Sequence, residues 1–157
     1  EDWRQRLRLE SLPDYLIVQN LGHHYGYRED AIARAHCGDR LAALYVLRIA
    51  MDHLAAAMLA SIGITNSYPK WRTRLLEMHQ DELDKREVET LLRYLFPNIN
   101  ADASGTVREA LAFADTAIGE LIGRRPQLIP ALLELDEQVS FVKRFSEIPM
   151  AQSSNQL

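Results

Sequence analysis

The chain has 157 residues, which suits a single domain and is enough to bury a core without disulfide or metal support. Hydrophobic residues make up 47% and charged residues 25%, so the composition excludes a disordered or collagen-like chain. The net charge of −4 argues against a protein that binds duplex nucleic acid by charge alone, and we expect no nucleic-acid partner. Only seven glycines and six prolines interrupt the chain, which favours long helices.

Helical patterns dominate the first half of the chain. Ser11 and Pro13 are typical of a helix start and predict a helix over 15–24. The longest pattern, 28–62, contains no proline and repeats apolar residues at three- and four-residue steps, so we expect one unbroken helix. This helix is apolar on nearly every face, which predicts a position in the centre of a bundle and an end at Gly63.

Shorter helices complete the prediction, and no segment shows the alternation of a β-strand. They are expected over 4–10, 67–80, 84–97, 106–122 and 128–145. Short connections favour antiparallel neighbours. We therefore predict an all-α, up-and-down helical bundle of five to six helices around one long central helix. A single domain is expected over 1–150, followed by a flexible tail over 151–157.

Cys37 is the only cysteine, so the chain forms no internal disulfide and no multi-thiolate metal site. We expect it to be buried as a small hydrophobic residue in a cytoplasmic protein. The longest uninterrupted apolar runs, 41–47 and 54–60, are too short to cross a bilayer, which needs about 20 residues. The chain begins at Glu1 rather than Met, so we expect a fragment of a longer protein.

Arg48 and His53 form an Arg-x4-His pair. The pair resembles the motif of the HEPN helical domains, and this resemblance implies metal-independent RNA cleavage, usually in a dimer, with arginine holding phosphate and histidine as acid and base. Ile49 departs from the polar residue that often follows the arginine. Five helical steps also place the two side chains about 140° apart. The alternative is that Arg48 and Asp52, one turn apart, neutralise each other beside the core.

Histidines occur in two further places along the predicted helices. His36, Asp39 and Arg40 lie within about one turn, which predicts either the wall of a polar pocket or an ordinary solvated helix end. His23 and His24 are helix neighbours that point in different directions. No third ligand lies at metal spacing from them, so we expect no metal site.

Glu29 and Asp30 lie near the start of the long predicted helix. Acidic groups in a first turn stabilise the helix through its dipole and need no function. They also suit a cationic substrate, or the role of a general base. The chain has no Gly-rich phosphate loop and no serine-hydrolase or zinc-protease motif that would favour another chemistry.

Three segments together resemble the helical C-terminal domain of kanamycin-type nucleotidyltransferases: 35–48 with its Gly38-Asp39 step, the Ala-rich run 55–60, and Lys70-Trp71 after the next turn. The helical partners of minimal nucleotidyltransferases and the HEPN domains share this bundle. The resemblance implies an intracellular enzyme that moves a nucleoside monophosphate from a Mg-nucleotide to a hydroxyl. The Gly-Ser step and paired aspartates of the family's catalytic domain do not occur in this chain.

On this resemblance, the chain is the substrate-binding helical domain of, or partner to, a nucleotidyltransferase, and it is inactive alone. We expect no cofactor in this chain, a catalytic domain upstream or on a separate chain, a homodimer, and no membrane. The candidate residues are Glu29, Asp30 and Asp39 for catalysis, and His36, Asp39, Arg40 and Tyr45 for substrate binding. Two alternatives stay open: a HEPN-type ribonuclease or toxin that uses Arg48 and His53, and a purely structural interaction module.

Overall fold

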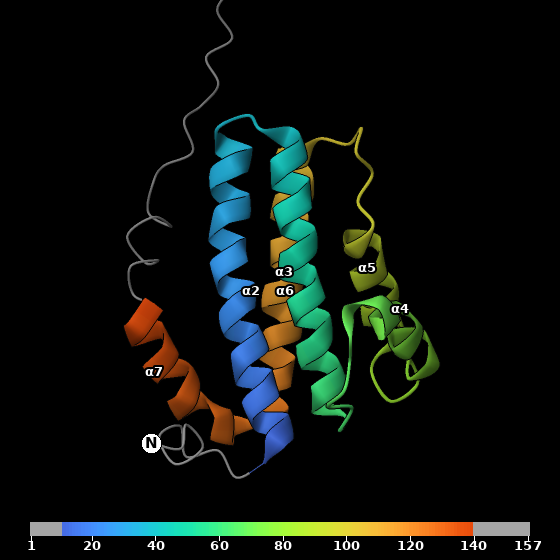
Figure 1. Cartoon of the computed structure of the whole chain (residues 1–157), viewed down its shortest axis with the longest axis vertical. Coiled ribbons are helices and arrows are strands. Elements are labelled where there is room, and N and C mark those ends of the chain that lie inside the picture. The colour runs from blue at the N-terminus through green and yellow to red at the C-terminus, as the bar shows by residue number, and fades with distance from the viewer. Residues whose placement is uncertain (1–10, 140–157) are drawn as a thin grey trace, which may run out of the picture.

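The computed structural model of the chain describes residues 11–139, which fold into six α-helices and a short 3-10 turn, without strands. The predicted all-α helical bundle is confirmed. The long helices α2, α3 and α6 stand side by side, α4 and α5 pack on α3, and α7 packs on α2 (Figure 1). The elements are α2 (Leu12–His36), α3 (Arg40–Ser61), α4 (Pro69–Met78), α5 (Lys85–Leu95), α6 (Ala103–Arg124), η1 (Pro126–Leu128) and α7 (Ile129–Val139).

Helix α3 is the centre of the bundle, and it contacts α2, α4, α5 and α6. Every residue from Leu54 to Ala60 is buried. The alanines in this stretch keep the helix narrow, so its neighbours approach closely. Among the described helices, α3 is the one whose length and hydropathy would also suit a membrane span, a property that buried core helices share.

The prediction of one unbroken helix over 28–62 is wrong, because the chain reverses at 37–39. Gly38 adopts a φ of 75°, a left-handed conformation that residues with side chains rarely adopt. Asp39 then opens α3, and its Oδ1 accepts a hydrogen bond from the backbone N–H of Ala42 at 3.2 Å. The segment is therefore an antiparallel pair of helices, α2 and α3, joined by a tight turn (Figure 1).

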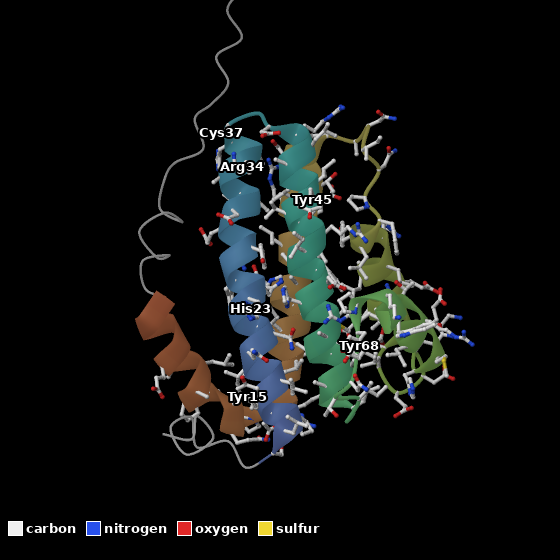
Figure 2. The ribbon with its side chains drawn as sticks, viewed as in Figure 1. Tyr15, His23, Arg34, Cys37, Tyr45 and Tyr68 are labelled. Carbon is white, nitrogen blue, oxygen red and sulfur yellow. The ribbon has the colours of Figure 1, made fainter. Side chains whose placement is uncertain are left out.

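Helix α2 begins where the sequence predicts and ends later. Ser11 caps it, with Oγ accepting a hydrogen bond from the N–H of Asp14 at 3.3 Å. The predicted end at residue 24 is wrong, because α2 continues through Gly26 to His36. An internal glycine costs a helix only about 1 kcal/mol, and the long α2–α3 contact offsets that cost. Cys37, predicted to be buried, is exposed at the turn between α2 and α3 (Figure 2).

A Gly38→Ala substitution tests this turn. We expect it to lower the free energy of unfolding by about 1 kcal/mol, because alanine is strained at a φ of 75°. Gly26→Ala is the matched control, since Gly26 lies exposed inside α2 with open space at its Cβ position. There alanine should stabilise the helix by about 1 kcal/mol. Urea unfolding followed by circular dichroism measures the free energy of unfolding of both variants. If both substitutions changed it in the same direction, the left-handed conformation of Gly38 at the turn would be contradicted.

Helices α5 and α6 begin at aspartate caps. The Oδ1 atom of Asp84 accepts hydrogen bonds from the N–H groups of Arg86 and Glu87 at 2.8 and 3.0 Å, at the predicted start of a helix over 84–97. Helix α6 starts after Asp102, a few residues before the predicted start, and continues just past the predicted stop at Gly123. These small differences at helix ends leave the predicted order of helices intact.

Three predictions reach beyond the described residues. The leading helix over 4–10 and the tail over 151–157, with the domain boundary at 150, lie outside them. Of the last predicted helix, 128–145, the described part corresponds to the end of η1 and to α7.

Arg125 holds one end of the bundle together. Its Nη1 pairs with the Asp14 carboxylate at 2.6 Å, and its Nη2 donates to the carbonyl of Ser61 at 2.8 Å. These bonds join the end of α6 to the start of α2 and the end of α3. The three long helices are therefore fixed relative to one another, two of them being the helices that carry the candidate site.

Candidate functional site

A pocket of about 430 Å³ opens between α2, the second half of α3 and the segment that leads into α4. It is called the His53 pocket below. Figure 2 shows His23 midway along α2 and Tyr68 at the start of α4, and both residues line this pocket. None of the described residues that line it is acidic. The lining side chains that are best able to form hydrogen bonds, transfer protons or bind a charged group are Asn20, His23, His53, Asn66, Ser67 and Arg72.

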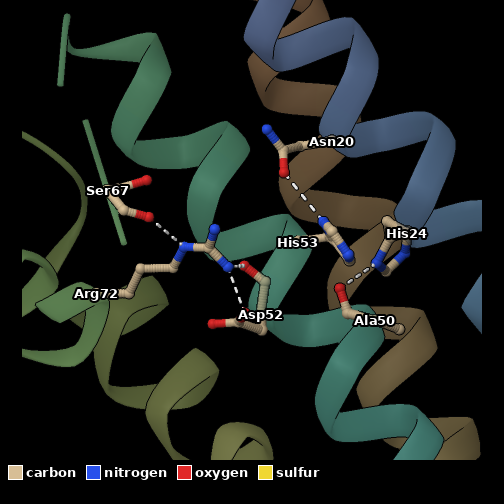
Figure 3. A network of polar contacts seen from close by, with 7 residues as sticks. All are labelled: Asn20, His24, Ala50, Asp52, His53, Ser67 and Arg72. Atoms are coloured by element: carbon tan, nitrogen blue, oxygen red, sulfur yellow. Dashed lines mark hydrogen bonds and ion pairs between the residues drawn. The ribbon is translucent and has the colours of Figure 1, made fainter. Parts of the chain in front are cut away.

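His53 has a fixed tautomer, because Asn20 holds it across the α2–α3 contact (Figure 3). The Nδ2 atom of Asn20 donates to the carbonyl of Leu16 at 2.7 Å, which leaves Oδ1 facing the Nδ1 atom of His53 at 3.0 Å. Since an amide oxygen can only accept, Nδ1 of the neutral imidazole carries the proton. The lone pair therefore lies on Nε2, which is the basic atom of the ring.

Other rings surround His53 and fix its position. The centroid of His23 lies 4.9 Å away, and Tyr27 stacks on His53 at 5.6 Å with 8° between the ring planes. Burial, followed by the nearby positive charges of His23 and Arg72, lowers the pKa of His53 from 6.5 to about 4. At neutral pH the side chain is therefore an uncharged base.

Arg72 reaches from α4 to α3 and is held by three acceptors, two of them on α3 and one in the segment before α4 (Figure 3). Its Nη1 pairs with the carboxylate of Asp52 and donates to the Asp52 carbonyl at 3.2 Å, while Nε donates to the carbonyl of Ser67 at 2.9 Å. Burial raises the pKa of Asp52 despite the opposing charge of Arg72. The third nitrogen, Nη2, makes no hydrogen bond within the part of the chain that the structure describes.

The predicted cluster of His36, Asp39 and Arg40 lies at the turn between α2 and α3, away from the His53 pocket. Asp39 is the cap of α3, so the helix-end interpretation accounts for it. His36 also lines a broader hollow between α2 and α6. At its rim, Arg28 forms an ion pair with Asp115. His36 therefore lies beside a hollow that is separate from the His53 pocket, and its role in substrate binding stays a prediction.

The other predicted site residues are spread along α2 and α3. Glu29 and Asp30 lie well inside α2, so the interpretation that they stabilise a first turn is wrong. Burial raises the pKa of Glu29, and the charge of Arg28 opposes that shift. Tyr45 projects from α3 with 63% of its surface exposed. Neither the carboxylates nor Tyr45 line the His53 pocket.

Arg48 and His53 lie on different sides of α3. Arg48 is exposed, with its guanidinium carbon 5.9 Å from the ring centre of Phe96 at the end of α5. His53 faces α2 instead. The predicted neutralisation of Arg48 by Asp52 is not the observed ion pair, because Asp52 pairs with Arg72. Within one chain, the two residues of the Arg-x4-His motif therefore do not share a pocket.

The sequence interpretation missed Asn20, His23 and Arg72 as site residues. His23 and His24 do point apart: His23 is exposed at the pocket, whereas His24 is buried with its Nδ1 2.9 Å from the carbonyl of Ala50 (Figure 3). One local pattern could have indicated the site, since Asn20 and His23 lie one turn apart on the same face of α2. The polar face of an otherwise packed helix marks a place where a ligand can enter.

Comparison with known proteins finds no protein family, no curated protein and no solved structure that matches the chain. Among residues 11–134, whose side chains the structure describes, no group of three or more His, Cys, Asp or Glu side chains is arranged to hold a metal ion. The chemistry of the chain is therefore inferred from the geometry of the His53 pocket itself.

Proposed function

We propose that the chain binds a hydroxyl-bearing acceptor in the His53 pocket, as the substrate-binding helical domain of, or partner to, a nucleotidyltransferase. The observation that supports this most is a neutral imidazole of fixed tautomer in a polar pocket, ready to accept a proton. The rings of His23 and Tyr27 and the amide of Asn20 hold that imidazole in place. Such preorganisation is what a general base or a specific binding site requires.

Two of the three segments that resemble the kanamycin-type family border this pocket. Ala56 and Ala60, from the Ala-rich run 55–60, line its wall. Lys70-Trp71 immediately precedes Arg72. The third segment contains the turn at Gly38, so the continuous central helix no longer supports the resemblance. The proposal therefore rests on the pocket and on the segments beside it.

In the proposed reaction, the acceptor hydroxyl attacks the α-phosphorus of a nucleoside triphosphate and pyrophosphate leaves. The proton of the hydroxyl passes to Nε2 of His53, while Asn20 keeps the other ring proton on Nδ1. Arg72 contributes a hydrogen-bond donor that orients the acceptor. We place the Mg-nucleotide and its metal ligands on a catalytic domain that lies upstream or on a separate chain. A cytoplasmic location and a homodimer stay predictions.

Nucleotidyl transfer by the full gene product, or by the chain with its catalytic partner, tests the proposal. The assay combines magnesium nucleoside triphosphates with a panel of hydroxyl-bearing acceptors and detects the modified acceptor by mass spectrometry. His53→Asn keeps a donor near the position of Nδ1 and removes Nε2, so we expect transfer to fall by about 10²- to 10⁴-fold. The matched control is His79→Asn, because His79 pairs with Glu82 at the far end of α4.

Three results would decide against the proposal. Transfer by His53→Asn at the wild-type rate, with an unchanged melting temperature, would remove His53 from the reaction. Cleavage of RNA by a dimer, lost in both Arg48→Ala and His53→Ala, would favour the HEPN-type ribonuclease. Failure to bind any small molecule would favour the interaction module, for which the exposed side chains of Leu41, Tyr45 and Phe96 offer a surface.

A further inference from the structure

We propose that the ligand of the His53 pocket carries an oxyanion, a phosphate or carboxylate group, bound between Nη2 of Arg72 and the imidazoles of His23 and His53. The description of this ligand as an acceptor rests on the proposed function. The binding of an oxyanion does not, because it follows from the donors and charges of the pocket.

Arg72 is arranged so that one donor stays available. Asp52 and Ser67 occupy Nη1 and Nε, and they fix the plane of the guanidinium without using Nη2. In Figure 3 the third nitrogen points away from Asp52. The side chain of Arg72 is only 12% exposed, yet its Nη2 atom stays accessible from the pocket, so a ligand that enters can accept a hydrogen bond from it. Phosphate and carboxylate oxygens are the acceptors that a guanidinium binds most strongly.

No negative charge in the pocket competes with such a ligand. The titratable and charged groups around His53 and its pocket are His23, His24 and Tyr27 from α2, Asp52 from α3, Tyr68 just before α4 and Arg72 from α4. Asp52 is the one acid among them, and its charge is compensated by Arg72. A cationic acceptor, which the carboxylates of α2 suggested from the sequence, finds no partner here. An anionic group finds one guanidinium donor and two imidazoles.

Binding of an oxyanion also changes the protonation of His53. In the free pocket, burial and the positive charges of its neighbours hold the pKa of His53 at about 4. A bound anion compensates those charges and raises the pKa. Below the raised pKa a proton from the solvent adds to Nε2 and the imidazolium donates a hydrogen bond to the anion, whereas above it Nε2 stays free to accept a proton. A pKa nearer to neutral is also what a general base needs.

Imidazole NMR titrations of the chain, in inorganic phosphate and in sodium chloride of equal ionic strength, test the inference. The nitrogen shifts of His53 report its tautomer and its pKa. We expect the pKa to rise by at least about one unit in phosphate, a tenfold gain in proton affinity. The double variant Asp52→Asn/Arg72→Gln removes the guanidinium without leaving an unpaired carboxylate, and it should lose the effect. Arg124→Gln, at an exposed ion pair with Glu120, should keep it.

Two outcomes would overturn the inference: equal His53 titrations in the two salts, or an undiminished phosphate effect in the double variant. Sodium acetate in place of phosphate separates the two ligand classes, and a response to either anion supports the site. A phosphate response without nucleotidyl transfer would leave the oxyanion site standing and remove the transferase proposal. Nucleotidyl transfer to acceptors without a phosphate response would support the transferase proposal and remove the oxyanion site.

Discussion

Replacing Leu54 by alanine is expected to lower the free energy of unfolding by about 2–5 kcal/mol. Leu54 is fully buried near the middle of α3. Four other helices contact α3, so the surrounding backbone cannot easily collapse into the space that the lost side chain leaves. The loss therefore combines the transfer free energy of the removed carbons with the cost of a cavity, which makes it the largest effect that we expect from one substitution.

Leu41→Ala is the matched control, because it removes the same atoms from the same helix. Leu41 lies in the first turn of α3 and is 60% exposed. We expect a change within about 0.5 kcal/mol there, as at other surface positions. Urea unfolding of both variants measures the difference. Similar losses at the two positions would contradict the placement of α3 in the centre of the bundle.

The sequence predicts the helices well because the spacing of apolar residues reports which face is buried. It does not predict the reversal at Gly38, because the helical pattern continues on both sides of the turn. Two adjacent residues encode the reversal: Gly38, which tolerates a positive φ, and Asp39, which caps the next helix. A glycine followed by a capping residue is a recognised signal for a helix end and a new start. Glycine and aspartate also occur inside helices, so the continuous helical period over 28–62 carried more weight in the prediction than these two residues.

The candidate site is less predictable because its residues come from three distant segments. The hydrogen bond between Asn20 and His53 spans 33 positions, and the ion pair between Asp52 and Arg72 spans 20. The periodic spacing of apolar residues in a single sequence indicates local structure and carries no information about such distant contacts. Local spacing drew attention to Asp39, and a local role, capping, accounts for it. The Arg-x4-His motif drew attention to His53 and paired it with Arg48, whereas the fold brings Arg72 into the same pocket as His53.

Acidification is the second condition with a large expected effect on stability. The pKa of His53 is about 4 in the folded chain and near 6.5 when unfolded, so the unfolded chain takes up the proton first as the pH falls. Stability from this residue is fully present above pH 6.5 and is lost as the pH falls toward 4. We expect the loss to be about 2 kcal/mol, which is below the full linkage value because solvent partly screens the ring.

His24 contributes to the same loss, for a related reason. Its ring is fully buried, its Nδ1 donates to the carbonyl of Ala50, and its Nε2 has no hydrogen-bond partner among the described residues. Burial, with the charge of Arg28, lowers the pKa of His24. Protonation of Nε2 would place an unpaired charge between α2 and α3, which disfavours the folded state. The wild-type chain therefore loses stability from two histidines as the pH falls below 6.5.

Urea unfolding at a series of pH values between 7 and 4 separates the two contributions. His53→Asn removes one titrating ring, and we expect it to lose about 2 kcal/mol less than the wild type over this range. Asn20→Ala is the control, because it removes the partner of Nδ1 but keeps the titrating ring. It should lower stability by about 1 kcal/mol at every pH and keep the wild-type pH dependence. The acids whose pKa values burial raises, Glu29, Asp52 and Glu87, act in the opposite direction and are common to all three chains. Identical pH profiles for His53→Asn and the wild type would mean that His53 titrates as freely in the folded chain as in the unfolded one.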